Sequence, residues 1–275
     1  MAVESESTSV RDPADTPLTF FGNEVKVERE RHGIRREDLA KKAACGYSLV
    51  AKVEAGTRLP HLSFARACDD LFPGAEGRFE RLYPLALRYA FPGWFQPYLA
   101  LEWKASRLRM FHPQLMPGLV QTERYARAVL RTDRPPNLET LVTGRIERQQ
   151  ILERADNPAR LWVILNQSAL TNVVGGRDVM REQLEHLLVL AGTPRHRVQV
   201  VEDKGNHHGY ASPFGILSFD DDEDVVHVDG YPRGYVLAEP DDVRRATDAY
   251  DLLTAMASSP DASADLISSI LKGYS

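Results

Sequence analysis

The segment from Gly33 to Gly56 (GIRREDLAKKAACGYSLVAKVEAG) constrains the fold of this chain most. Glycine is a common residue just past the end of a helix, so these two glycines mark the ends of helical stretches. The apolar positions between them are Ile34, Leu39, Ala40, Ala43, Val50 and Val53. The small residues Ala43, Ala44 and Gly46 allow two helices to turn sharply against each other. The segment therefore predicts a short helix over 36–43 and a second over 47–55, packed closely together.

The flanking sequence predicts further helices on both sides of this pair. One covers 21–31, one opens near Pro60, where proline is tolerated in a first turn, and one covers 76–89. Pro92-Gly93 then marks a domain boundary. Residues 1–17 are polar, acidic and proline-containing, which predicts a disordered tail. We therefore expect a mainly α N-terminal bundle over 18–91, followed by a second domain over 92–275.

The paired helices resemble the lambda-repressor/Cro-like (xenobiotic-response-element) class of helix-turn-helix domain. The residues that match are Leu39, Ala40, Val50, Val53, Glu54, Gly56 and Pro60. The resemblance implies binding to double-stranded DNA, with the helix after the turn lying in the major groove. It places Gly46, Tyr47, Ser48, Leu49 and Lys52 at the groove. It also places Arg36, Lys52 and Arg58 near phosphates, where Arg and Lys make salt-sensitive contacts.

The sequence departs from this class at several positions. Arg35-Arg36 stands where the class has a Ser or Thr cap followed by Gln, and Glu28 stands where Leu is usual. The absence of a helix cap costs about 0.5–2 kcal/mol. Few polar side chains remain to read bases, so a helix-turn-helix used only for protein contacts is an alternative.

The distribution of charge is consistent with a modular DNA-binding protein, although the net charge is −5. Residues 20–66 contain ten Lys or Arg against six Asp or Glu, and residues 220–275 contain four against thirteen. A basic N-terminal region on an acidic chain is the pattern expected of such a protein. Charge asymmetry also occurs without nucleic-acid binding, so this observation carries little weight alone.

The second domain, 92–275, mixes helical and strand patterns. Helices are expected over 97–110, 122–131, 138–155, 177–191, 240–257 and 261–271. Short apolar runs over 161–165, 198–201, 214–219, 225–228 and 234–237 predict strands. The last three are closely spaced, which is typical of an antiparallel meander. We therefore expect an α+β domain with a small, largely antiparallel sheet.

This domain resembles the C-terminal domain, of unassigned biochemical function, of a group of actinobacterial antitoxin-like transcriptional regulators. The residues that match include Glu102, Ser106, Arg109, Phe111, Pro113, Pro117-Gly118-Leu119, Gln121-Thr122 and Tyr125-Ala126-Arg127. The resemblance implies a regulator of a toxin–antitoxin type of system, with a small partner protein encoded by a neighbouring gene. Glu102, Arg109, Gln121, Tyr125 and Arg127 are candidates to contact that partner or a ligand. Alternatively, Glu102 and Arg109 form an ion pair that holds the proline-rich loop.

Nothing in the sequence indicates an enzyme, so no catalytic residue, cofactor or metal site is expected. His207-His208 are adjacent and unsuited to converge on one ion, and Asp220–Asp224 reads as a solvated hairpin turn between strands. The two cysteines, Cys45 and Cys68, lack metal-ligand spacing and fit a reducing compartment. No segment has the ~18 consecutive apolar residues of a membrane helix. We therefore expect a cytoplasmic protein.

Three functions follow as hypotheses. The first is a homodimeric transcriptional regulator on a palindromic operator, because one such module buries too little surface to bind tightly alone. The second is an interaction module that sequesters a small partner, which exposed apolar groups near Trp94-Phe95 or Trp103 would support. The third is a small-molecule sensor with a pocket between the sheet and its helices.

Overall fold

The computed structural model describes residues 16–203 and 212–274. These residues form two compact units. Unit 1 contains the chain up to Pro92 together with Glu139–Glu147, and unit 2 contains Gly93–Leu138 and the chain from Arg148 onward. Most of one helix, α8, therefore groups with the N-terminal unit although it lies far along the sequence.

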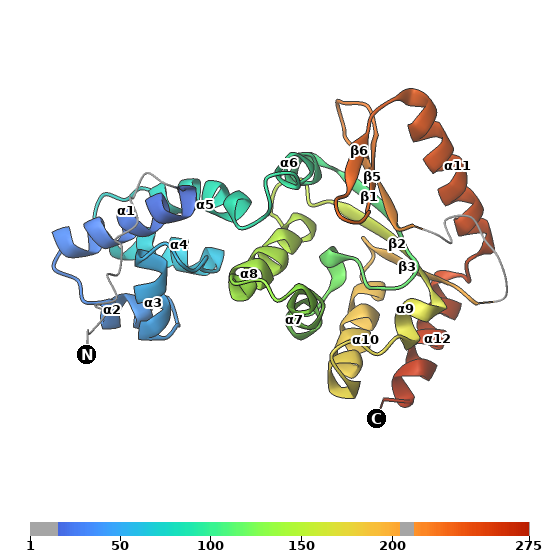
Figure 1. The fold of residues 1–275 in the computed structure, drawn as a ribbon, viewed down its shortest axis with the longest axis horizontal. Coiled ribbons are helices and arrows are strands. Elements are labelled where there is room, and N and C mark those ends of the chain that lie inside the picture. The colour runs from blue at the N-terminus through green and yellow to red at the C-terminus, as the bar shows by residue number, and fades with distance from the viewer. Residues whose placement is uncertain (1–15, 204–211, 275) are drawn as a thin grey trace, which may run out of the picture. The chain divides into compact units, whose positions relative to one another are not determined.

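Unit 1 is a bundle of helices joined by short turns within its described residues, as predicted (Figure 1). Its helices are α1 (Pro17–Arg31), α2 (Arg36–Lys42), α3 (Tyr47–Glu54), α4 (Leu62–Leu71), α5 (Arg78–Tyr89) and most of α8 (Leu138–Arg148). Helix α1 begins four residues before the predicted Phe21, because Thr16 caps it. The Thr16 hydroxyl accepts from the Thr19 amide at 3.0 Å, and Pro17 occupies the first turn. The part of the expected tail before Thr16 lies outside the described residues.

The core of unit 1 is aromatic at its centre. Phe21 of α1 meets Phe79 and Tyr83 of α5 edge to face, with ring centroids 6.1 and 6.2 Å apart. Beside it, α1 crosses the end of α3 at Gly22. A Cβ atom at this glycine would lie 2.0 Å from the carbonyl oxygen of Val53. Only a residue without a side chain permits this approach, so Gly22 sets how closely α3 is held against α1.

Unit 2 combines six strands with helices. The strands are β1 (Arg107–His112), β2 (Arg160–Asn166), β3 (Arg197–Val201), β4 (Phe214–Ser218), β5 (Val225–Val228) and β6 (Tyr235–Leu237). Its α-helices are α6 (Gln96–Lys104), α7 (Glu123–Leu130), α9 (Gln167–Thr171), α10 (Arg177–Ala191), α11 (Pro240–Met256) and α12 (Pro260–Lys272). Its 3-10 turns are η1 (Gly118–Val120), η2 (Arg131–Asp133) and η3 (Gln149–Leu152).

The expected small, largely antiparallel sheet is wrong. The strands form one six-stranded mixed sheet in the order β3-β2-β1-β4-β5-β6. Strands β1, β2 and β3 pair in parallel, whereas β4, β5 and β6 form the antiparallel meander expected at the end of the chain. Strand β1 joins the two halves, because it pairs in parallel with β2 and antiparallel with β4.

The error arose from β1, which lies largely inside the helix predicted over 97–110. Helix α6 ends at Lys104, and the chain then extends as Arg107–His112. In this strand Leu108 and Met110 face one side of the sheet, and Phe111 packs on the other. A strand covered on both faces lacks the alternation of polar and apolar residues that distinguishes a half-exposed strand, so its local pattern resembles that of a buried helix.

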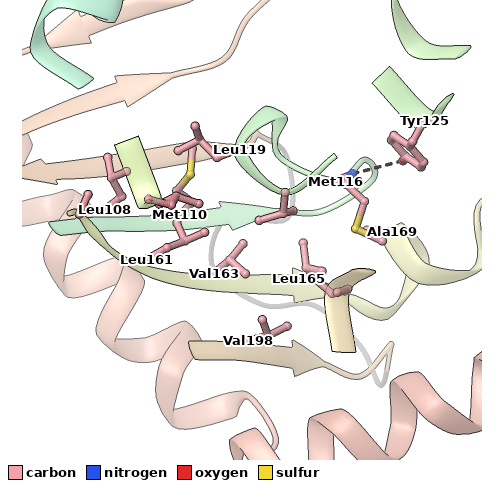
Figure 2. Packing of buried hydrophobic residues seen from close by; sticks show 14 of the residues in the cluster. Leu108, Met110, Met116, Leu119, Tyr125, Leu161, Val163, Leu165, Ala169 and Val198 are labelled. Atoms are coloured by element: carbon pink, nitrogen blue, oxygen red, sulfur yellow. Dashed lines mark hydrogen bonds between the residues drawn. The ribbon is translucent and has the colours of Figure 1, made fainter. Parts of the chain in front are cut away.

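Both faces of the sheet are covered. The larger core contains Leu108, Met110, Leu161, Val163, Leu165 and Val198, which point to one side (Figure 2). Side chains from α6, α7, α9, α10 and α12 complete it. On the opposite face, Tyr250 and Leu253 of α11 pack on Phe111 and Ile164. The alternation of inward side chains along β1 and β2 follows the two-residue period of a strand.

Candidate nucleic-acid interface

Helices α2 and α3 are joined by a four-residue turn, which includes Ala44 in the left-handed region at φ 49°. Helix α3 buries Val50 and Val53 completely against unit 1. Its opposite side presents Ser48 and Lys52, one helical turn apart and both exposed. The outward face of α3 is therefore polar, and it carries hydrogen-bonding groups of the kind that contact bases and phosphates in a DNA groove.

The start of α3 is also accessible. Tyr47 is 49 % exposed, Gly46 is exposed and Leu49 is half-buried. Gly46 supplies no side-chain cap, and Arg35 supplies none for α2. The first amide groups of a helix have no partner inside the helix and favour anionic ligands such as phosphate. The missing cap at Arg35 was expected from the sequence, and the missing cap at Gly46 leaves polar amide groups at the start of α3, beside Tyr47 and Ser48.

A buried carboxylate anchors the other end of α3. Glu54, whose side chain is 2 % exposed, accepts a hydrogen bond from Arg29 Nε at 2.5 Å and one from Arg36 Nε at 2.8 Å. Arg36 also reaches the Tyr47 hydroxyl at 3.4 Å. The hydrogen bond to the Tyr47 hydroxyl has the larger effect on the pKa of Arg36, and this bond and the one to Glu54 both raise that pKa. Glu54 therefore joins α1, α2 and α3, and this holds α3 at a defined angle to the other two helices.

Two predicted phosphate contacts are engaged with carboxylates inside unit 1. Arg36 is bound to Glu54, as described above, and Arg58 donates to Glu139 at 3.4 Å. Each keeps one part of its guanidinium group close to the protein. Lys52 is the predicted phosphate contact that extends from α3 into solvent.

The unusual Glu28 is compensated by an ion-pair network. Its side chain is 6 % exposed and lies 3.0 Å from Arg78 of α5 and 2.9 Å from Arg31. A buried carboxylate is tolerated when cations and hydrogen bonds replace its hydration. A charged pair between α1 and α5 thus replaces the apolar contact that the class usually makes here.

The five candidate residues of unit 2 do not form one cluster. Arg109 pairs with Asp224 at 3.1 Å, whereas Arg127 pairs with Glu123 at 2.7 Å within α7. Gln121 and Tyr125 both hold the loop at Met116. Gln121 donates to its carbonyl at 2.7 Å, and the Tyr125 hydroxyl accepts from its amide at 3.3 Å (Figure 2).

Glu102 belongs to a separate, buried polar group. It accepts from the Tyr98 hydroxyl at 2.7 Å and pairs with Arg148 at 3.0 Å. The alternative ion pair between Glu102 and Arg109 is therefore wrong, because each has a different partner. Burial raises the pKa of Glu102. Next to this group, the His227 ring stacks on Tyr98 with centroids 3.9 Å apart, and burial lowers the pKa of His227.

The acidic run Asp220–Asp224 connects β4 to β5, as predicted. It is not wholly solvated, because Asp224 accepts from Arg109 and from the Ser218 hydroxyl, the latter at 2.9 Å. His207-His208 lie outside the described residues. Among residues 16–203 and 212–274, no group of three His, Cys, Asp or Glu side chains is arranged to hold a metal ion.

Comparison with known protein families finds one match in the N-terminal part of the chain and a second in the C-terminal part. Residues 21–77 match a helix-turn-helix domain, so α1–α4 are a module of DNA-binding regulators. Residues 95–269 match the domain of unknown function DUF5753, which spans more than half of the chain. The chain belongs to the DUF5753 family. No curated protein and no solved structure matches it. Within the described residues, no helix is both long and apolar enough to cross a membrane.

The contacts that organise the helix-turn-helix were not foreseen from the sequence. Glu54 was singled out as a match to the class, but its two arginine partners were not. Glu147 of α8 was missed as well. It accepts from the Leu62 amide at 3.1 Å and lies 2.6 Å from His61 Nδ1, and so caps α4. Arg29 and Glu54 are 25 positions apart in the sequence, and Leu62 and Glu147 are 85 positions apart. A local sequence pattern does not indicate which residues pair over such separations.

Proposed function

We propose that this member of the DUF5753 family is an antitoxin-like transcriptional regulator that reads an operator with α3. The observation that carries the proposal is the polar outward face of α3, with Ser48 and Lys52 exposed on a helix whose other side is fully buried. Lysine at this position supplies a phosphate contact, and serine can hydrogen-bond a base edge or a phosphate. Tyr47, Gly46 and Leu49 add contacts at the start of the helix.

The buried network around Glu54 supports a role that requires rigidity. Specific reading of a groove needs side chains held in a fixed position, and Glu54 joins three helices of the module. Arg36 serves first to hold the module together through Glu54, and Arg58 joins the module to Glu139 of α8. The Arg36 side chain is 33 % exposed, so its guanidinium extends the positive edge beside α3 and complements phosphates flanking the groove.

We further propose that the protein acts as a homodimer. One helix-turn-helix module contacts a small area, and symmetric dimers read half-sites about one helical turn of DNA apart. Unit 2 offers apolar surface for the contact. Leu252 and Met256, one turn apart on α11, are 46 % and 51 % exposed. Large exposed apolar side chains on one helix face are typical of an association surface.

The partner that we propose for unit 2 is a small protein encoded by a neighbouring gene. Trp103 supports this part of the proposal, because it is 47 % exposed at the end of α6, with Arg154 stacked over its ring at 5.6 Å. Exposed tryptophan and arginine are the residues that most often anchor protein interfaces.

The test of DNA binding is a titration of the purified protein with DNA from upstream of its own gene, at several salt concentrations. We expect saturable binding at micromolar protein or below. Lys52→Ala should reduce the slope of log K against log[salt] by about 1, because one phosphate contact is lost. Ser48→Ala should weaken binding to the operator more than binding to random DNA. Lys26→Ala, an exposed lysine on α1, is the matched control and should leave both quantities unchanged.

A second candidate function is sequestration of the small partner with DNA binding lost. The observation that favours it is the engagement of Arg36 with Glu54, which leaves few side chains free to read bases. If the folded protein forms no salt-sensitive complex with DNA and copurifies with the small protein encoded by the neighbouring gene, this second function is favoured. Operator binding that fails in Ser48→Ala and Lys52→Ala would exclude it.

A further inference from the structure

We propose that a cavity between the segment entering α6 and the β5–β6 hairpin binds a small, neutral aromatic molecule. The cavity lies within unit 2 and has a volume of about 150 Å³. Its walls are Trp94, Phe95, Pro97, Tyr98, His227, Gly234, Tyr235 and Val236. The inference goes beyond the proposed regulation of transcription and does not rest on it, because it concerns a site in the other unit.

Aromatic rings dominate the walls and already form a stack. Phe95 and Tyr98 have centroids 5.0 Å apart, and Tyr98 stacks on His227 at 3.9 Å. Trp94 contacts Phe95 edge to face at 5.5 Å. Aromatic side chains favour offset or edge-to-face contact with further rings at such separations. A planar aromatic guest would therefore extend a stack that the protein has already assembled.

The charged groups near the cavity are each paired with another group, and the Asp229 carboxylate lies 3.6 Å from Nδ1 of the wall residue His227. The Tyr98 hydroxyl donates to Glu102, and Glu102 pairs with Arg148. Arg148 in turn lies over the Phe95 ring at 5.4 Å. Burial lowers the pKa of His227, so its imidazole is neutral near pH 7. The described wall residues therefore present apolar and neutral surface, which favours a guest without a formal charge.

The size and the rim of the cavity fit such a guest. A cavity of about 150 Å³ lined by apolar side chains is large enough for a single benzene ring. Trp94 and Tyr235 remain 40 % and 54 % exposed at its edge. A guest seated between them would remove part of this aromatic surface from water, which favours binding.

Phenol is a suitable probe, because it is neutral, soluble and close in size to the cavity. Ligand-observed NMR on the full chain would measure its binding, with cyclohexanol as a non-aromatic probe of similar size and tetramethylammonium as a cation. We expect phenol to bind at least about tenfold more tightly than either. Trp94→Ala and Tyr235→Ala should each weaken phenol binding about tenfold.

Each variant has a matched control. Trp103→Ala and Tyr231→Ala remove exposed residues of the same types that do not line the cavity, and should leave binding unchanged. Should a truncation unfold the protein, Val236→Phe fills the cavity and should abolish phenol binding. The proposal is overturned by absence of phenol binding to the folded chain or by equal loss in controls and test variants. Binding of cyclohexanol or tetramethylammonium as tight as that of phenol also overturns it.

Discussion

Replacing Glu54 by Gln tests whether the buried ion network holds the recognition helix. The substitution keeps the shape of the side chain and removes its charge. Arg29, whose side chain is 10 % exposed, then keeps only the exposed carboxylate of Glu30, at 3.2 Å, as a counter-charge. Arg36, whose side chain is 33 % exposed, recovers part of its hydration. Breaking a buried pair from one side costs about 3–5 kcal/mol. Because Arg36 is partly hydrated and Gln retains one acceptor oxygen, we expect a loss near the lower end, about 3 kcal/mol.

Unit 1 can be followed separately from unit 2 in this experiment. The three tryptophans, Trp94, Trp103 and Trp162, all lie in unit 2, so their fluorescence reports only that unit. Far-ultraviolet circular dichroism reports the helices of both. A loss of about 3 kcal/mol in a domain of this size lowers its melting temperature by more than about 10 °C. We expect this shift in a dichroism transition, without a matching shift in tryptophan fluorescence.

The matched control is Asp38→Asn, which removes the charge from an exposed pair with Arg35. Exposed pairs contribute little to stability, so this variant should melt like the parent protein. If Glu54→Gln melts no lower than Asp38→Asn, the ion network does not hold α3 in place. Operator binding measured below both melting temperatures should weaken in Glu54→Gln alone.

Three further predictions concern other parts of the fold. Gly22→Ala places a Cβ atom 2.0 Å from the Val53 carbonyl oxygen of α3, so urea unfolding should show a loss of about 1–3 kcal/mol. Gly93→Ala, at a glycine between α5 and α6 with open space around it, should show little change. Glu147→Ala removes the cap of α4 and should cost about 1–2 kcal/mol; an unchanged melting temperature would contradict that role. Burial lowers the pKa of His112 from 6.5 to about 4, beside His227, Asp229 and Arg148. The unfolded chain therefore binds the extra proton first, and stability should fall by about 3 kcal/mol as pH drops from 6.5 to 4, a slope that His112→Gln should reduce.

Much of unit 1 could be predicted because its signals are local. Gly33 and Gly56 have φ angles of 64° and 63°, so they end helices by a backbone conformation that other residues adopt at a cost. The apolar spacing between them has the period of a helix, and it placed α2 and α3 to within one residue. Ser48 and Lys52 were placed at the groove by the resemblance to the helix-turn-helix class, and both are exposed on the side of α3 opposite the buried Val50 and Val53.

Unit 2 was predicted in part because its later strands are neighbours in sequence. The meander of β4, β5 and β6 has short connections, so pairing between consecutive strands follows from turn positions. The parallel half is different. Strand β1 pairs Leu108 with Leu161 across more than fifty residues, and nothing within the run RLRMFH distinguishes it from the end of a buried helix.

The amino-acid order thus determined the helix-turn-helix module, the meander and the residues that α3 presents to solvent, because each depends on contacts within a few turns of the chain. Tertiary structure alone decided the mixed sheet, the two arginines on Glu54, and the meeting of Tyr98 with His227 beside the cavity. These features depend on contacts between segments that are far apart in the sequence. Such contacts are determined by how complete faces of the sheet and of the helices pack together. Burial then changed the chemistry of the groups involved, by requiring a partner for Glu54 and Glu102 and by keeping His227 neutral.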